Sequence, residues 1–142
     1  MNNFEICVMT IEDYDAVYEL WSNTPGIGLS RNDDSREAIW RYLQRNPDGC
    51  FVAKVGGVTV GAVLGGHDGR RGTIRHLVVD KNKRGLGIGK ALVDAVLDNL
   101  RRDGISKVWL VVFGDNAAGN VFWEKMGFTT RPDINYRDRS IL

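Results

Sequence analysis

The chain has 142 residues, and its 19 Lys plus Arg against 18 Asp plus Glu give a net charge of +1. Its 43% hydrophobic and 26% charged residues are average for one globular domain and exclude a disordered chain. The near-neutral charge excludes a protein that binds nucleic acid through overall basicity.

The hydrophobic pattern predicts strands and helices in an α/β order. Thr10, with Asp13 three residues later, is a capping box that opens the first helix, and Pro47 follows the end of the second. The expected elements are a strand over 4–9, a helix over 11–21, a second helix after 35, strands over 50–55, 58–64 and 73–79, a long helix over 87–104, a strand over 107–113, a helix over 117–126 and extended chain from 128. No linker or repeat separates these elements, so we expect a single domain over residues 1–142.

Three glycines at alternate positions carry the clearest chemical signal. Gly85, Gly87 and Gly89 lie between the end of a predicted strand and the start of the longest amphipathic helix. Glycine lets a backbone approach a ligand closely, and a helix start offers unpaired N–H groups and the positive end of its dipole. With Arg84 and Lys90 beside them, these glycines predict a cradle for the pyrophosphate of a phosphorylated cofactor.

Other glycine motifs fit this segment less well. A P-loop places Ser or Thr after its Gly-Lys pair, whereas Ala91 follows Lys90 here. A dinucleotide-binding fingerprint has the wider spacing G-x-G-x-x-G in the first strand–helix turn. For the glycines alone, a turn that merely permits close packing of a helix against a strand is a further alternative.

The surrounding residues resemble the GNAT superfamily of acyl-CoA-dependent N-acetyltransferases. Arg84-Gly-Leu-Gly87-Ile-Gly89 is similar to the R/Q-x-x-G-x-G/A loop of that family. Leu77-Val78-Val79 is similar to the strand that lies beside the pantetheine arm. Asn116 and the run from Phe122 to Phe128 resemble the family's N-x-x-A-x-x-x-Y-x-K-x-G-F signature.

The loop from Gly65 to Gly72, together with Leu20-Trp21, is most similar to a small bacterial subgroup near the ribosomal-protein alanine acetyltransferases. The resemblance implies a GNAT-type α/β fold, with a mixed, mostly antiparallel sheet, a splayed central parallel strand pair and about four helices. It also implies an enzyme that transfers an acetyl group from acetyl-CoA directly to a primary amine, of a small molecule or a protein N-terminus. The cofactor contacts that it implies are Leu77, Val78, Val79, Arg84, Gly85, Leu86, Gly87, Ile88, Gly89, Lys90, Asn116 and Lys125.

Two positions depart from the family pattern. Trp123 stands where the family has the tyrosine that protonates the leaving thiolate, and an indole N–H is no usable acid. Val111 stands where the alanine acetyltransferases have a glutamate base. The chain therefore uses a substitute residue or a water relay, or it is a non-catalytic acyl-CoA-binding module, which is the alternative function.

The candidate catalytic substitutes are His76 and Tyr136. Strand alternation predicts that His76 faces away from Arg75, Leu77 and Val79, which weakens its case. The expected substrate-binding residues are Trp21, Arg31 and Arg75, with Tyr42 as a further lining residue.

The remaining signals concern metals, thiols and location. Cys7 and Cys50 have no histidine partners at ligand spacing, which predicts two buried, reduced thiols and no metal site. The chain starts with no signal peptide and contains no apolar run of membrane-spanning length, so we expect a cytoplasmic protein without membrane partners. An exposed edge at the late strands is compatible with a homodimer.

Overall fold

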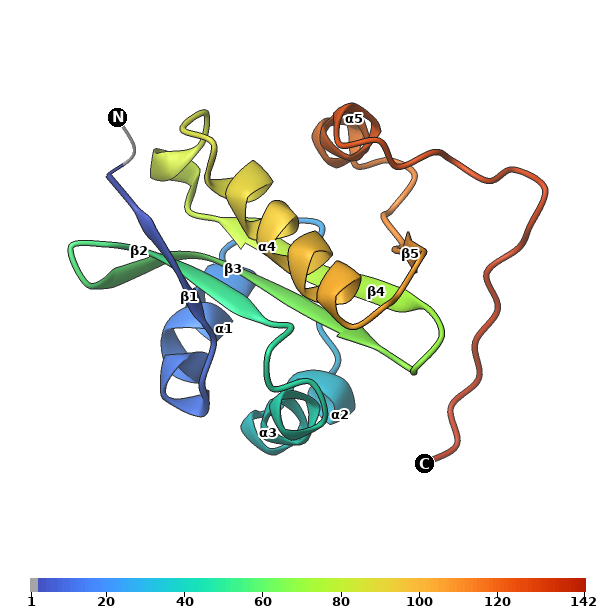
Figure 1. The fold of residues 1–142 in the computed structure, drawn as a ribbon, viewed down its shortest axis with the longest axis horizontal. Coiled ribbons are helices and arrows are strands. Elements are labelled where there is room, and N and C mark those ends of the chain that lie inside the picture. Colours follow the sequence, from blue (N-terminus) through green and yellow to red (C-terminus); the bar gives the residue numbers. More distant parts are fainter. Residues whose placement is uncertain (1–2) are drawn as a thin grey trace. The chain divides into compact units, whose positions relative to one another are not determined.

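A computed structural model describes residues 3–142 (Figure 1). It divides into two compact units at Val111/Val112, and each unit is described by itself. The first unit contains β1 (Glu5–Val8), α1 (Tyr14–Ser22), α2 (Arg31–Asp34), α3 (Arg36–Arg45), β2 (Phe51–Val55), β3 (Val58–His67), β4 (Gly72–Val79), α4 (Ile88–Arg102) and β5 (Val108–Trp109). Short 3-10 turns span Ile11–Asp13 and Lys81–Lys83, and the second unit contains α5 (Ala117–Lys125).

The five strands form one mixed sheet in the order β1-β2-β3-β4-β5. Neighbours are antiparallel except for β4 and β5, which run parallel. This arrangement, with the five α-helices, confirms the α/β fold class and the parallel strand pair. The β4–β5 pairing is short, because it covers only Gly72 with Val108 and Thr73 with Trp109.

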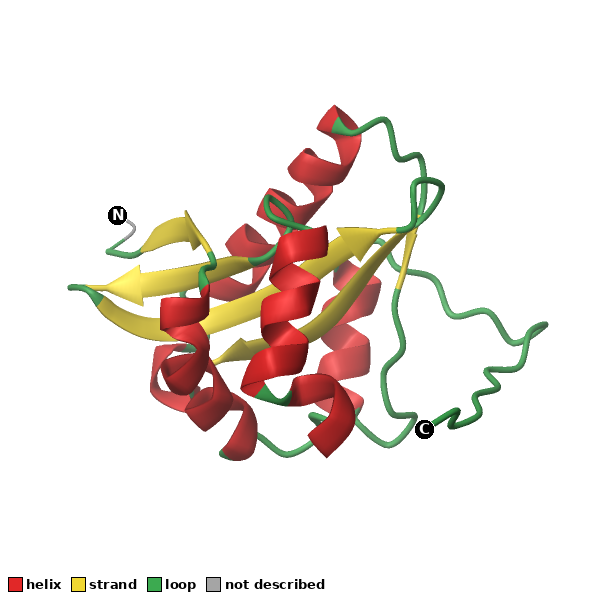
Figure 2. Ribbon diagram, turned by 90° about the horizontal axis from the view of Figure 1, so that it is seen from below, coloured by secondary structure: helices red, strands yellow, loops and turns green. Residues whose placement is uncertain are grey.

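Helices cover both faces of the sheet (Figures 1 and 2). On one face, a Cβ added to Gly61 or Gly65 of β3 would meet side chains of α4, so glycine lets this helix pack closely. On the other face, α1 and α3 bury a core that includes Trp21, Ile39 and Val78. A sheet buried on both faces explains why β3 is a nearly continuous buried run.

A β-bulge interrupts β4. Ala62 pairs with Val78 and Leu64 pairs with Arg75, so His76 and Leu77 together lie opposite Val63. The backbone φ of His76 is +54°, and within residues 3–142 no other non-glycine residue has a positive φ. The bulge adds one residue to the strand, so side chains before and after it are out of phase.

The structure corrects several boundaries of the expected elements. The first helix begins as a 3-10 turn at Ile11 and becomes α-helical only at Tyr14, although the Thr10 N–H does donate to the Asp13 carboxylate, at 2.9 Å. The strand expected over 107–113 is formed only over Val108–Trp109. The pairing with β4 stops at Trp109, although β4 itself continues to Val79.

The expected extended segment after Phe128 forms no strand in the structure, and residues 128–142 contain no helix either. The segment TTRPDINYRDRS alternates charged and polar residues with few apolar ones, so it has no continuous face to bury. The final strand of the predicted order is therefore absent from the described chain, and β5 is the strand at that edge of the sheet.

Both cysteines are free, and only Cys50 is buried, since Cys7 is part-exposed. Burial raises the pKa of the Cys50 thiol to about 12. The thiol donates a hydrogen bond to the Gly65 carbonyl oxygen at 3.4 Å. Among residues 3–142, no helix is long and apolar enough to cross a membrane.

Candidate active site

The loop before α4 has the backbone that the glycine pattern predicts. Gly85 and Gly87 have φ values of +76° and +86°, a left-handed conformation that glycine adopts without strain. No heavy atom lies within 4 Å of the position that a Cβ would take at either residue. These two glycines are therefore not required for internal packing, and the space beside them is open to a ligand.

The first turn of α4 offers unpaired donors at the same place. The first intrahelical hydrogen bond runs from the Ala91 N–H to the Gly87 carbonyl oxygen, at 3.0 Å. The N–H groups of Ile88, Gly89 and Lys90 therefore have no acceptor within the helix. Unpaired N–H groups and the dipole of this 15-residue helix together favour an anionic ligand.

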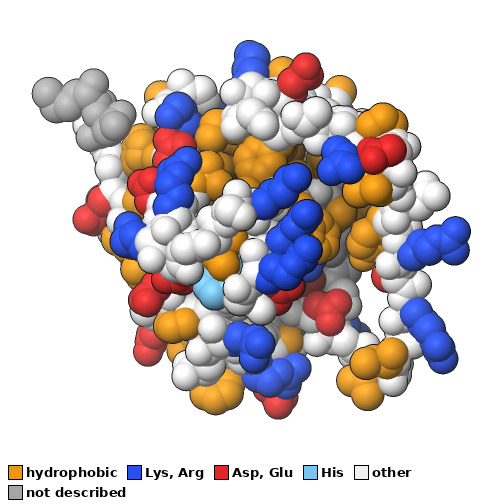
Figure 3. Space-filling model, turned by 45° about the vertical axis from the view of Figure 1, so that its right-hand side comes forward, with side chains coloured by type: hydrophobic (Ala, Val, Ile, Leu, Met, Phe, Trp, Pro, Cys, Tyr) orange, Lys and Arg blue, Asp and Glu red, His pale blue; other side chains and the backbone are white. Residues whose placement is uncertain are grey.

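Basic side chains, with acidic ones among them, lie across the face that Figure 3 shows, and Arg84 and Lys90 each contact a specific partner. Arg84 folds back onto the end of β4, where its Nε donates to the Val79 carbonyl oxygen at 3.3 Å. Lys90 pairs with Asp94 one turn along α4, at 2.7 Å. Asp94 thus neutralises part of the positive charge of Lys90. The backbone N–H groups at the start of α4 have no such partner within the helix.

The free edge of β4 lies next to this loop. Asp80 donates its N–H to Val60 of β3, so the N–H and C=O of Val79 point to the opposite edge of β4, the side of β5. Alternation gives Leu77 the same direction, while Val78 pairs toward Ala62 and buries its side chain. Because the pairing with β5 ends at Thr73, the backbone groups of Leu77 and Val79 have no partner strand.

The bulge changes the position of His76 from the expected one. Its ring faces the layer of α1 and α2, with Nε2 at 2.9 Å from Oδ1 of Asp34 and the ring edge-on to Trp21. Arg75 faces the same layer, since it interacts with Tyr42 of α3. The prediction that His76 faces away from Arg75 is therefore wrong, because the bulge breaks the alternation between them.

The predicted substrate-binding residues lie in different environments. Trp21 is only 1% exposed, and its indole N–H donates to the His76 carbonyl oxygen at 3.3 Å, so it supports the bulge from within the core. Arg31 is exposed at the start of α2. Arg75 is exposed, with its guanidinium carbon 5.8 Å from the centre of the Trp109 ring across the β4–β5 pair. Burial raises the pKa of Tyr42, which packs against the core.

The second unit holds the other predicted residues. Asn116 caps α5, because its side-chain oxygen accepts from the Gly119 N–H at 3.0 Å. Trp123 packs edge-on between Phe122 and Phe128, and Lys125 is exposed. Tyr136 is 67% exposed in the segment without regular structure. The cofactor and catalytic roles of Asn116, Lys125 and Tyr136 stay predictions.

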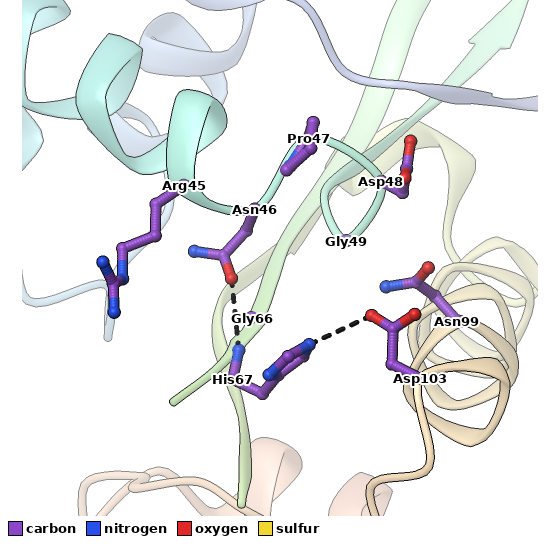
Figure 4. Close-up of a pocket in the computed structure, with 9 residues that line it drawn as sticks. All are labelled: Arg45, Asn46, Pro47, Asp48, Gly49, Gly66, His67, Asn99 and Asp103. Atoms are coloured by element: carbon purple, nitrogen blue, oxygen red, sulfur yellow. Dashed lines mark hydrogen bonds and ion pairs between the residues drawn. The ribbon is translucent and has the colours of Figure 1, made fainter. Parts of the chain in front are cut away.

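A second histidine–aspartate pair lies at the other end of α4, in a pocket of about 60 Å³ (Figure 4). His67 donates from Nε2 to Asp103 at 3.0 Å and accepts the Gly69 N–H on Nδ1, also at 3.0 Å. The next residue, Asp68, forms a turn as predicted, and the backbone N–H groups of Arg71 and Arg70 hold its pKa below the ordinary value. This pocket is a set of mutually satisfied polar groups.

Sequence reasoning missed Asp34, which the structure brings to His76. Asp34 is the last residue of α2, a single helical turn in a segment where the sequence pattern predicts no helix. The available signal was Ser30 followed by Asp33 and Asp34, since a serine and an acidic residue at this spacing mark a helix start. In the structure, the Ser30 N–H donates to Oδ2 of Asp34 at 2.8 Å.

Comparisons with known proteins agree on one family. The model of the acetyltransferase (GNAT) family matches residues 14–128. A protein named as an acetyltransferase from Pectobacterium atrosepticum is 36% identical over 137 residues, covering 96% of each chain.

Two solved structures are similar over most of the chain. A Mycobacterium tuberculosis protein in complex with CoA has a TM-score of 0.72 and 25% identity, covering 88% of this chain and 71% of that one. The ribosomal-protein-alanine N-acetyltransferase of Brucella melitensis has a TM-score of 0.73 and 25% identity, covering 98% of this chain and 100% of its own.

Proposed function

Because the chain belongs to the GNAT family of acetyltransferases and transfers an acetyl group from acetyl-CoA to an amine, we propose that the loop 84–90 and the free edge of β4 hold the donor. We further propose that the acceptor is the α-amine of a peptide or protein N-terminus. The observation that carries the first proposal is the open, left-handed backbone at Gly85 and Gly87 directly before α4. The name of the Brucella melitensis structure supports the second.

The loop and the helix start supply the anion site. The N–H groups of residues 85–90 would bind the pyrophosphate, because they are unpaired and lie at the positive end of α4. The Arg84 side chain stays close to Val79, so its positive charge lies between the loop and the strand edge. Residues without a Cβ at positions 85 and 87 leave the space that a phosphate needs.

The free edge of β4 would align the rest of the donor. Leu77 and Val79 direct their N–H and C=O groups to the edge of β4 that faces β5, beyond the point where the pairing of these two strands ends. An extended pantetheine arm would bond to these groups much as a strand does. Acetyl-CoA supplies an activated thioester, so the protein mainly has to orient the amine and donate an N–H to the carbonyl oxygen.

We propose that both units act together as the single domain expected over 1–142. The match to the family model supports this, because residues 14–128 extend across the division at Val111/Val112. Asn116 and Lys125 are then the proposed donor contacts from the second unit.

A pair of glycine substitutions tests the donor site. Gly87 and Gly104 flank the two ends of α4, have φ values of +86° and +77°, and have no neighbour within 4 Å of an added Cβ. Gly87→Glu and Gly104→Glu should therefore each destabilise the fold by about 1–2 kcal/mol from backbone strain. Only Gly87→Glu should abolish the rise in thermal midpoint that acetyl-CoA causes in the wild type.

Retention of this rise in Gly87→Glu would overturn the assignment of the donor site. The acceptor proposal is tested by thiol release from acetyl-CoA with short peptides that carry free N-termini and with small primary amines. Faster release with peptides, led by peptides that begin with alanine, is the expected result. Faster release with small amines would replace the peptide proposal by a small-molecule acceptor.

A further inference from the structure

We propose that His76 is the catalytic base that removes a proton from the acceptor amine, and that Asp34 holds its ring for this task. The inference rests on the proposed function and adds a residue role to the same site. Neither Trp123 nor Val111 can take up a proton, so the family's usual acid and base positions supply no base.

The Asp34 carboxylate is fixed from several directions. Its Oδ2 accepts from the Ser30 N–H at 2.8 Å, its Oδ1 lies 2.9 Å from Nε2 of His76, and its backbone carbonyl accepts from the Tyr14 hydroxyl at 2.6 Å. The Asp34 side chain is only 7% exposed. A carboxylate held in this way is a rigid acceptor for one ring nitrogen, as in the aspartate–histidine part of a catalytic triad.

This contact assigns the tautomer of His76. An ionised carboxylate only accepts hydrogen bonds, so the proton of a neutral ring is on Nε2 and the lone pair is on Nδ1. No residue of the described chain bonds to Nδ1. Among residues 3–142, every buried side-chain nitrogen or oxygen has a hydrogen-bond partner. Because Nδ1 of His76 has no such partner, it is not buried, and it is in contact with solvent. The side chain as a whole is 19% exposed.

The position of the ring along β4 suits a base. His76 directly precedes Leu77, whose backbone faces the free edge proposed to hold the donor. Its φ of +54° lies in the left-handed region, which histidine adopts more often than most non-glycine residues do. Trp21 packs edge-on against the ring, with 5.0 Å between the ring centres, so the imidazole is held in one place beside this edge.

The proton balance of the step is simple. Nδ1 takes one proton from the ammonium form of the acceptor, while Nε2 keeps its hydrogen bond to Asp34. The neutral amine then forms a C–N bond to the acetyl carbon as the C–S bond breaks. The second proton leaves the nitrogen for the thiolate sulfur, and the imidazolium returns the first proton to solvent.

The groups that face the ring are few. Asp34 of α2 and Trp21 of α1 contact it directly, and Tyr14 of α1 reaches the pair through the Asp34 carbonyl. Arg75 precedes it on β4, with its guanidinium near the Trp109 ring. Asp34 is thus the acidic side chain bonded to the ring among the residues that the structure describes.

The first test needs no acceptor. Long-range ¹H–¹⁵N NMR of the wild type, recorded at a pH where the His76 ring is neutral, should show its proton on Nε2 and an unprotonated Nδ1. A neutral ring with its proton on Nδ1 would overturn the proposal.

The second test uses His76→Asn, which suits the positive φ, with His67→Asn as the matched control. At pH 7, with an alanine-initiated tripeptide and acetyl-CoA, His76→Asn should lower kcat/KM by about 10²-fold or more, while His67→Asn stays within about twofold. A His76→Asn protein that binds acetyl-CoA normally and keeps activity within threefold would overturn the base role. Should His76→Asn fail to fold, Asp34→Asn replaces it, with an expected loss of about tenfold. If the wild type uses no acceptor at all, the proposed function is contradicted. This result is distinct from a loss of activity that is confined to the His76 or Asp34 variant.

Discussion

Two histidine–aspartate pairs of nearly equal length lie in the first unit, and they differ in the second ring nitrogen. His76 and Asp34 are 2.9 Å apart, and His67 and Asp103 are 3.0 Å apart. In the second pair, Nδ1 of His67 already accepts the Gly69 N–H, so the ring has no lone pair left. In the first pair, Nδ1 is open to solvent. A short contact alone therefore does not identify a catalytic pair.

The two carboxylates also differ in burial. The Asp34 side chain is 7% exposed, whereas that of Asp103 is 47% exposed. Water screens an exposed pair, which then contributes little to stability or to reactivity. A buried carboxylate keeps its influence on the ring. Burial of the acid and a free second ring nitrogen, taken together, distinguish the pair that we propose to be reactive from the other pair.

The largest expected effect is on catalysis. We expect kcat/KM at pH 7 to fall about tenfold in Asp34→Asn and about 10²-fold in His76→Asn. The double variant should be no slower than His76→Asn alone, because Asp34 acts only through the ring. Steady-state rates of the four proteins form the required cycle. Losses that multiply to about 10³-fold would show that the two residues act separately, and Asp103→Asn should leave the rate unchanged.

A second difference should appear in the free energy of unfolding. Asp34→Ala leaves the Ser30 N–H and the His76 ring without their partner in a buried place, so we expect a loss of about 3 kcal/mol. Asp103→Ala removes an exposed pair, and the expected loss is below about 1 kcal/mol. Urea unfolding at pH 7 measures both. Equal losses would contradict the contrast in burial.

The smallest effect concerns Cys50, whose thiol bonds to Gly65 near the His67 pocket. Its folded-state pKa of about 12 lies above the unfolded value near 9, so only the unfolded state loses the proton in between. The free energy of unfolding should therefore fall as pH rises above 9, by about 1.4 kcal/mol per pH unit. Cys50→Ala should flatten this slope between pH 9 and 10.5. If the slope of the free energy of unfolding against pH is the same in Cys50→Ala as in the wild type, a group other than the Cys50 thiol causes the loss of stability.

Much of the fold followed from local patterns in the sequence. The Gly56-Gly57 turn, the buried runs of β2 and β3 and the long helix after Gly87 are each encoded by adjacent residues. The loop before α4 was predictable for the same reason, because positive φ at Gly85 and Gly87 depends on glycine itself.

The features that were missed depend on contacts between distant residues. The bulge at His76 arises from the register of β3 against β4, which no single segment records. Asp34 and His76 are 42 positions apart in the chain, so no local sequence motif indicates that they form a pair. The short β5 likewise depends on where its pairing with β4 stops, which the apolar run over 107–113 does not encode.

The pH dependence of kcat/KM, compared between the wild type and His76→Asn, tests the central claim most directly. A peptide α-amine has a pKa of about 8, so most of it is protonated at pH 7 and neutral at pH 9. At pH 7 a base has to remove a proton from the amine before it can react, whereas at pH 9 the amine is already neutral and needs no base. With the alanine-initiated tripeptide, the account predicts that the ratio of the two rates falls by about tenfold from pH 7 to pH 9. A ratio that stays constant over this range would contradict the assignment of His76 as the base.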